Sequence, residues 1–346
     1  MVIYRFIVYI MLEEEPTNFI GQGAYGCVYK QNLECSNKPN KKQNKIKEYL
    51  TKVHMKKENA KSEVEVSEMI RQIKNYERYF SPVLESCTAS LAEINKSDIE
   101  KCKLVKDADA KYFTTKVRYI VGNTMDEYID KFTSLSKSKS SSPKRQQEKI
   151  IYMCEYLEKG AKVLNKNGII HFDLKESNVI VDETDRPIII DFGLSIILKK
   201  LVTQKDFADA FYYFTYDKAE MRYEPWCVEI ALLSYLSQQQ DFEELLSKED
   251  ADKAIEIAFN YIDGVLPVEP TDTGFIIEAD VKEYKDRKQK TITKFVGKKV
   301  KELVNELMKT YDKWDKYAIG IIMMNNLRFN ETDKKQIDTI RSRILF

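Results

Sequence analysis

Two short polar motifs in the second half of the 346-residue chain constrain its fold and chemistry more than any other feature. Residues 171–178 read HFDLKESN and residues 191–193 read DFG, so that Asp191 follows 18 residues after Asp173. Strand-forming runs joined by a polar turn lie between the motifs, which predicts a β-hairpin. Such a hairpin would bring Asn178 and Asp191 to the same end.

These residue types are the ones that phosphoryl transfer requires. The reaction needs a carboxylate to orient and deprotonate the attacking hydroxyl, oxygen ligands for Mg²⁺, and a cation beside the transferred phosphate. Asp173 would supply the carboxylate and Lys175 the cation, whereas Asn178 and Asp191 would bind the metal. A single carboxylate of this kind could be an ordinary loop or capping residue, but the set at these spacings predicts the reaction class.

A glycine-rich segment near the N-terminus is a second phosphate-binding signal. Residues 21–28 read GQGAYGCV, and the missing Cβ atoms of Gly21, Gly23 and Gly26 allow backbone N–H groups to approach phosphate oxygens. The pattern alone also fits a dinucleotide-binding fold, or a glycine turn without a ligand. The β-forming residues directly after Gly26 favour a hairpin over a loop that opens a helix.

With these motifs the sequence resembles the eukaryotic-type protein kinase superfamily, over about Phe19 to Leu327. The resemblance implies an α+β, bilobal protein-kinase-like fold. The first lobe, residues 1–121, would hold a small antiparallel β-sheet and one helix. The second lobe, residues 122–346, would be mainly helical.

The resemblance also implies cofactors and substrates. Such kinases use ATP and Mg²⁺, with Mn²⁺ as an alternative ion. Leu174 and Lys175, directly after Asp173, resemble the serine/threonine branch, so the expected substrates are Ser and Thr hydroxyls of proteins. The divergent plan and the abundance of Lys, Asn and Ile resemble the serine/threonine kinases of large DNA viruses.

Further roles follow from the resemblance alone. Lys52 lies on a β-rich run 26 residues after Gly26 and matches the lysine that binds the nucleotide phosphates. Glu63 matches its helix partner, with Glu65 and Glu68 as alternatives. Val117 would be the gatekeeper before the hinge. The residues expected to contact the nucleotide are Ile20, Gly21, Gly23, Gly26, Val28, Lys52, Val117, Tyr119 and Ile120.

Three departures from the family pattern concern regulation and the C-terminal lobe. Phe172 replaces the usual Arg before the catalytic Asp, which predicts activity without phosphorylation of the activation segment. The A-P-E motif is absent, and residues 223–229 are its expected stand-in, with Glu229 in the role of the glutamate. An insertion of about residues 230–314 could replace terminal helices of the family or dock a substrate. The central helix should begin at Asp315, which would hold the catalytic-loop backbone.

Composition and charge narrow the functional classes. Lys and Arg number 56 and Asp and Glu 55, so the net charge of +1 provides no field for nucleic acid or an anionic bilayer. No apolar run approaches the roughly 20 residues of a membrane-spanning helix. The two His and the six Cys without a CxxC pair argue against structural zinc.

The cysteines and the N-terminal residues give information on the cellular compartment of the protein. A chain of this length does not need disulfides to hold its core, which suits a reducing compartment, so we expect a cytoplasmic protein. If the protein is viral, that means the host cytoplasm or the virion. Residues 1–12 resemble the apolar part of a signal peptide, but the acidic residues 13–15 follow where a cleavage site should be. A misread start before Met11, an edge strand and a short anchor stay open as alternatives.

Two rival functions are considered beside the kinase. A small-molecule phosphotransferase of kinase-like fold would share Asp173, Asn178 and Asp191, but Lys175 and the complete DFG argue against it. A pseudokinase scaffold is suggested by Phe172 and the altered C-terminal lobe. Every residue needed for transfer is nevertheless present.

Overall fold

The chain forms two compact units in a computed structural model. Unit 1 comprises Met1–Lys61 and Val83–Tyr119, and unit 2 comprises Ser62–Pro82 and Ile120–Phe346. Ser62–Pro82 belong to unit 2, although the predicted first lobe, residues 1–121, included them. The lobe boundary at residue 121 stays a prediction. The structure describes residues 17–22, 26–36, 49–107, 109–136, 143–212, 225–266 and 274–346.

Unit 1 is built on a five-stranded antiparallel sheet with the order β1-β2-β3-β5-β4. One face of this sheet packs with the segment around helix α2 in a small apolar core. Cys27 and Tyr29 of β2 and Val53 of β3 belong to this core. Because side chains alternate along a strand, the adjacent residues Val28 and Lys52 lie on the other face. The elements are β1 Phe19–Gln22, β2 Gly26–Tyr29, β3 Tyr49–His54, β4 Val83–Ser90, α2 Lys96–Glu100 and β5 Lys111–Arg118.

Two disulfides connect separate parts of unit 1. The bond Cys27–Cys102 joins β2 to the segment after α2, and Cys35–Cys87 joins the loop after β2 to β4. The expectation that this chain does without disulfides is therefore wrong. The paired residues are 75 and 52 positions apart, and strand pairing brings them together, so no local spacing pattern reveals them.

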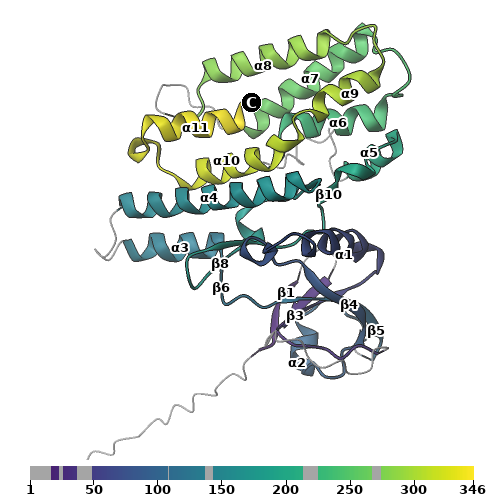
Figure 1. Ribbon diagram of the computed structural model, residues 1–346, viewed down its shortest axis with the longest axis vertical. Coiled ribbons are helices and arrows are strands. Elements are labelled where there is room, and N and C mark those ends of the chain that lie inside the picture. Colours follow the sequence, from purple (N-terminus) through teal and green to yellow (C-terminus); the bar gives the residue numbers. More distant parts are fainter. Residues whose placement is uncertain are drawn as a thin grey trace, which may run out of the picture. The chain divides into compact units, whose positions relative to one another are not determined.

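Unit 2 is mainly helical and has one large apolar core. Its central helix, α10, packs against α4 and α11, and Figure 1 shows α4 along one side of α10 and α11 along the other. The helices are α3 Met125–Ser136, α4 Pro143–Lys166, α5 Gln204–Ala210, α6 Val228–Gln239, α7 Lys248–Val265, α8 Glu278–Thr293, α9 Val300–Met308, α10 Trp314–Asn326 and α11 Lys334–Ile344. Helix α1, Glu58–Arg71, begins in unit 1 and continues in unit 2.

Short strands in unit 2 position the polar motifs. Strands β6 (Gly122–Thr124), β8 (Val179–Asp182) and β9 (Pro187–Ile189) form a three-stranded sheet, and β7 (Ile169–Ile170) pairs with β10 (Ile196–Ile197). The pair β8-β9 is the hairpin predicted between the motifs. Single turns of 3₁₀ helix occur at Tyr76–Arg78, Glu176–Asn178, Leu198–Lys200, Tyr311–Lys313 and Phe329–Glu331.

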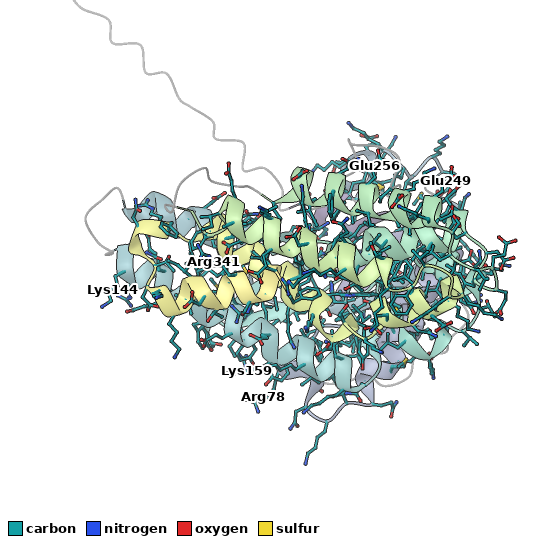
Figure 2. All side chains as sticks on the ribbon, turned by 90° about the horizontal axis from the view of Figure 1, so that it is seen from above. Arg78, Lys144, Lys159, Glu249, Glu256 and Arg341 are labelled. Atoms are coloured by element: carbon teal, nitrogen blue, oxygen red, sulfur yellow. A yellow bond between two sulfur atoms is a disulfide. The ribbon has the colours of Figure 1, made fainter. Side chains whose placement is uncertain are left out.

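The predicted insertion before the central helix consists of α6, α7, α8 and α9. Helix α7 packs against α6 and α8, and α9 packs against α6. Figure 2 shows Arg341 of α11 beside α8, and the Arg341 Nε lies 3.4 Å from a carboxylate oxygen of Asp280. The apolar residues of these helices belong to the core of unit 2, which favours the interpretation that they replace terminal helices.

The α+β class with a sheet-containing N-terminal part and a helical C-terminal part is thus confirmed. Among the described residues, no helix combines the length and the apolar character that crossing a bilayer requires.

Candidate active site

The residues of the HFDLKESN motif converge within the loop between β7 and β8. Asn178 Nδ2 donates hydrogen bonds to the Asp173 Oδ2 and to the Asp173 backbone oxygen, both at 2.8 Å. Lys175 Nζ lies 3.3 Å from Asp173 Oδ1. The 3₁₀ turn Glu176–Asn178 folds the chain back and makes these contacts possible. The Asp173 carboxylate is therefore oriented by an amide and an ammonium group at once.

The β8-β9 hairpin places Asn178 next to the DFG motif, as predicted. Val179 pairs with Ile189, and the Ile190 N–H donates to the Asn178 backbone oxygen at 3.0 Å. Asp191, the next residue, has a φ of 58°, which is uncommon for a residue with a side chain. Such conformations persist where the surrounding structure enforces them, and they concentrate at functional sites.

The oxygens of Asn178 and Asp191 suit a magnesium ion that is shared with phosphate. Mg²⁺ is usually held by one or two protein ligands and completes its shell with water and phosphate oxygens. Among the described residues, no three His, Cys, Asp or Glu side chains come together as a metal site. The donor set fits an ion that arrives with a nucleotide rather than one enclosed by protein.

The backbone of the catalytic loop is held by Asp315 on α10. Its carboxylate accepts hydrogen bonds from the N–H groups of His171 at 2.9 Å and of Phe172 at 3.0 Å. Burial raises the pKa of Asp315 above its ordinary value, although His171 and the two N–H groups favour the charged form. These bonds confirm the role predicted for Asp315, and α10 begins one residue earlier than expected.

His171 connects the catalytic loop to the DFG segment. Its Nε2 lies 3.0 Å from the Ile190 backbone oxygen, and its own backbone oxygen accepts a hydrogen bond from Ser195 Oγ at 3.1 Å. The imidazole packs on the Phe192 ring with centroids 5.2 Å apart. The two motifs therefore form one hydrogen-bonded and packed body.

Phe172, which stands where the family usually has Arg, is part of a buried aromatic cluster. Its ring lies 4.8 Å from the Trp226 ring and 5.8 Å from the Phe211 ring, measured between centroids. Trp226 Nε1 donates a 2.5 Å hydrogen bond to the Phe172 backbone oxygen. Phe172 has a φ of 71°, a rare value for a bulky residue, and its N–H and C=O are both engaged.

The sequence did not predict that Phe211 and Trp226 contact Phe172. One signal was available, because Trp226 is one of only two Trp in the chain and lies just before Glu229. Residues 213–224, between these two aromatics, lie outside the described residues. The described ends of the activation segment are thus joined through the ring of Phe172.

Glu229, the expected stand-in for the A-P-E glutamate, is buried in the first turn of α6. It forms an ion pair with Lys288 of α8, and Lys288 lies 4.6 Å from the centroid of the Tyr284 ring. The cation comes from the insertion, and the sequence did not suggest it because Lys288 lies 59 residues away. The inserted helices therefore take part in holding the end of the activation segment.

The residues predicted to bind the nucleotide in unit 1 fall on its sheet. Lys52 of β3 pairs with Val28 of β2, so these two side chains share one face. Ile20 and Gly21 lie on β1, where a Cβ on Gly21 would meet no atom within 4 Å. Gly23 lies outside the described residues.

The structure places Gly26 and the residues of the predicted hinge as follows. A Cβ on Gly26 would lie 2.1 Å from the Val53 carbonyl oxygen, so the close approach of β3 requires glycine there. Val117, the predicted gatekeeper, is the next-to-last residue of β5 and pairs with Val83 of β4. Tyr119 follows that strand and is the last residue of unit 1, whereas Ile120 is the first residue of the second part of unit 2.

Burial distinguishes the three glutamates proposed as the partner of Lys52. Glu63 of α1 is 4% exposed, Glu65 forms an ion pair with Lys200, and Glu68 is exposed. A buried carboxylate requires a partner, which favours Glu63. Because Lys52 belongs to unit 1 and Glu63 to unit 2, their pairing stays a prediction.

Comparison with known families gives one match. A family model described as protein kinase domain matches residues 15–310, which is more than half of the chain. The match includes the glycine-rich segment and both polar motifs but ends before Asp315. The hydrogen bonds of Asp315 are therefore independent support for the central helix. The comparison with individual curated proteins found no match.

Proposed function

We propose that this chain, which belongs to the protein kinase family, transfers the γ-phosphate of ATP to serine or threonine hydroxyls of proteins. Family membership supports a protein kinase phosphotransferase. The observation that carries the finer proposal is the convergence of Asp173, Lys175 and Asn178 in one loop beside Asp191.

Asp173 would orient the acceptor hydroxyl and take its proton. Its carboxylate is held from two sides, by the Asn178 amide and the Lys175 ammonium, and its side chain is 13% exposed. A positioned base of this kind contributes through proton transfer and alignment of the nucleophile. Lys175 would balance the negative charge of the phosphoryl group as it moves to the acceptor.

The predicted metal ligands lie in unit 2, and most of the predicted nucleotide contacts lie in unit 1. Bound Mg²⁺, or Mn²⁺ in its place, supplies neutralisation of the phosphate charge. Asn178 and Asp191 would provide its protein ligands. Lys52 would contact the α- and β-phosphates, oriented by Glu63. The segment around Gly21, Gly23 and Gly26 would cover the phosphates, and Ile20, Val28, Val117, Tyr119 and Ile120 would surround the nucleoside.

Activity should not depend on phosphorylation of the activation segment. In place of a cation that could pair with a phosphate, Phe172 contributes a ring that packs on Phe211 and Trp226. Apolar packing needs no modification to form. The proposed serine/threonine preference rests on Leu174 and Lys175 after Asp173.

Cytoplasmic localisation stays a prediction, but the disulfides contradict one of the expectations that supported it. It was argued from a chain that does not need disulfides, whereas four cysteines of unit 1 are paired. Disulfides persist mainly in oxidising surroundings. Measuring the oxidation state of these four cysteines in the native protein therefore tests the predicted compartment.

The decisive experiment compares wild-type protein with Asp173→Asn in a cell lysate supplied with Mg-ATP, followed by phosphosite mapping. We expect Asp173→Asn to reduce the transfer rate about 10²–10⁴-fold while ATP binding is retained. Asp185→Asn is the matched control, because Asp185 lies in the β8-β9 turn, contacts Tyr128 and Lys149, and has a φ of 61° that Asn tolerates.

The possible results separate the rival functions. Phosphate on Ser and Thr of proteins, lost in Asp173→Asn and retained in Asp185→Asn, supports the proposal. Label from ATP that enters only a metabolite would indicate a small-molecule phosphotransferase. A wild-type protein that binds ATP but transfers nothing would indicate a pseudokinase. Full activity in Asp173→Asn would remove Asp173 from the mechanism.

A further inference from the structure

A disulfide lies directly beside the glycine-rich segment. Cys27 follows Gly26 on β2 and is bonded to Cys102, which lies after α2. The two residues are 0% and 2% exposed, and both belong to the small core of unit 1. The strand that leaves the glycine-rich segment is therefore covalently attached to the chain between β4 and β5.

The same chain segment also holds β1, the strand that enters the glycine-rich segment. Gln22 Oε1 accepts a hydrogen bond from the Lys103 N–H at 2.8 Å. The Asp98 carboxylate accepts hydrogen bonds from Thr17 Oγ1 at 2.5 Å and from the Asn18 N–H at 2.8 Å. We call residues 98–103 the clamp segment. It is bonded to both strands of the β1-β2 hairpin.

The clamp segment acts from the face of the sheet opposite to the proposed nucleotide. Cys27 and Tyr29 point into the small core, so Val28 between them lies on the other face together with Lys52. A change at the disulfide therefore leaves the predicted nucleotide contacts chemically intact. What it changes is how firmly the hairpin that carries them is held.

The second disulfide provides a comparison within the same unit. Cys35 and Cys87 are half-buried, and their bond lies beyond the end of β2 rather than next to Gly26. The chain at Cys35 is also held by backbone pairing with Ala89 and by a 2.8 Å hydrogen bond from the Ser36 N–H to the Thr88 oxygen. Breaking this disulfide should change the hairpin less.

We propose that Cys27–Cys102 is a redox modification site that controls nucleotide affinity. This inference rests on the proposed kinase function. With the bond formed, the β1-β2 hairpin is ordered before the nucleotide arrives, so binding loses less conformational entropy. With the bond reduced, only the hydrogen bonds to Gln22 and Asp98 and the apolar packing hold the hairpin.

The chemistry is thiol–disulfide exchange with a dithiol reductant. One thiolate of the dithiol attacks a sulfur of the Cys27–Cys102 bond, giving a mixed disulfide and one free cysteine thiolate. The second thiolate of the dithiol then closes its own disulfide and releases the other cysteine. Two electrons pass to the protein, and both cysteines take up protons. Because both sulfurs are buried, the clamp segment must open first, so the half-buried Cys35–Cys87 bond should be reduced earlier.

The experiment measures Mg-ATP affinity of the full chain in defined oxidation states. The protein is titrated with dithiothreitol, the state of each disulfide is followed by thiol alkylation and mass spectrometry, and dissociation constants are measured at each stage. We expect reduction of Cys35–Cys87 to leave the affinity within about twofold, and reduction of Cys27–Cys102 to weaken it about tenfold.

Two double variants test the assignment without reductant. Cys27→Ser with Cys102→Ser should weaken Mg-ATP binding like full reduction, whereas Cys35→Ser with Cys87→Ser should not. Hydrogen exchange of residues 19–29 should speed up in the first variant only. Where the first variant fails to fold, the reductant titration of wild-type protein decides.

The outcomes distinguish this inference from the proposed function. Equal affinity in both states of Cys27–Cys102, or an equal loss in both double variants, would overturn the redox site and leave the kinase proposal standing. An oxidised protein that does not bind Mg-ATP would overturn both. The expected pattern supports both.

Discussion

The two units of this kinase hold their functional loops by different means. In unit 1 the β1-β2 hairpin is attached to the clamp segment by the Cys27–Cys102 disulfide and by hydrogen bonds to Asp98 and Gln22. In the described part of unit 2 the catalytic loop is held by packing and by hydrogen bonds. Its N–H groups donate to the Asp315 carboxylate, and Trp226 donates to its backbone oxygen, while Cys154 is a free thiol.

The size of the two cores explains the difference. The core of unit 1 is small and lies on one face of a single sheet, whereas the core of unit 2 extends over α4, α10 and the inserted helices. A small core supplies little stability, and small units commonly rely on covalent links. A large core can bury a polar network such as that of Asp315 and keep it ordered without such links.

The largest effect should come from removing the carboxylate under the catalytic loop. Asp315→Ala leaves the buried N–H groups of His171 and Phe172 without an acceptor. We expect a loss of about 2–5 kcal/mol in the free energy of unfolding, together with a strong fall in kcat. Asp312→Ala is the control, because the Asp312 side chain is half-exposed and its contact with Lys316 is 3.5 Å long. A variant Asp315→Ala with wild-type stability and kcat would contradict this account.

We expect a reductant to destabilise unit 1 and to leave the stability of unit 2 unchanged. Loss of a disulfide costs about 2–4 kcal/mol, so full reduction should destabilise unit 1 strongly. Hydrogen exchange measured by mass spectrometry is suited to this comparison because it reports on each segment separately. We expect faster exchange in β1, β2 and α2 and unchanged exchange in α4 and α10. Equal acceleration in α10 would show that the units do not differ in this way.

A smaller effect is expected at the aromatic cluster of unit 2. Trp226→Phe removes the donor to the Phe172 backbone oxygen but keeps a ring, so we expect a loss of about 1–2 kcal/mol and a lower kcat. Tyr261→Phe is the control, because it removes a different hydrogen bond, which the Tyr261 hydroxyl donates to the Trp226 backbone oxygen at 2.6 Å. This control should cost similar stability with kcat unchanged. If both variants alter kcat equally, the bond to Phe172 has no special role.

The smallest effect is the pH dependence of the clamp segment. Burial would raise the pKa of Asp98, but hydrogen bonds from Thr17, from the Asn18 N–H and from Lys101 lower it below its ordinary value. A lowered pKa means that Asp98 stabilises the fold above its unfolded pKa of about 3.9, and that this contribution is lost as the pH falls through the lower folded value.

Urea unfolding of wild-type protein and Asp98→Asn between pH 7 and about pH 3 measures this contribution. The stability difference between them should be largest at neutral pH and should shrink on acidification. A difference that is independent of pH would exclude the charge of Asp98 as its source.

Local sequence was sufficient wherever the contact partners are close along the chain. The β8-β9 hairpin could be predicted because its turn and its two strands lie within a dozen residues, and this alone brings Asn178 to Asp191. The strand that carries Lys52 and the helix that carries Glu63 were predicted from local patterns as well, whereas the roles of these two residues followed from the resemblance to protein kinases. Glu63 was the first choice from the sequence, and its burial now favours it further over Glu65.

Partners far apart along the chain could not be predicted. The Cys27–Cys102 bond depends on the segment between β4 and β5 returning to β2, and Lys288 reaches Glu229 because α8 packs within unit 2. The Phe172 position was recognised as unusual, yet its aromatic partners were not identified.

The sequence by itself determined the family and the residues proposed for phosphoryl transfer, because the kinase motifs are short and are defined by residue types and spacings. The tertiary structure alone decided how those groups are supported: by a disulfide and a clamp segment in unit 1, and by Asp315, Trp226 and Lys288 in unit 2. The physical reason is that support requires burial and contact between distant residues, and these arise only when the strands and helices pack.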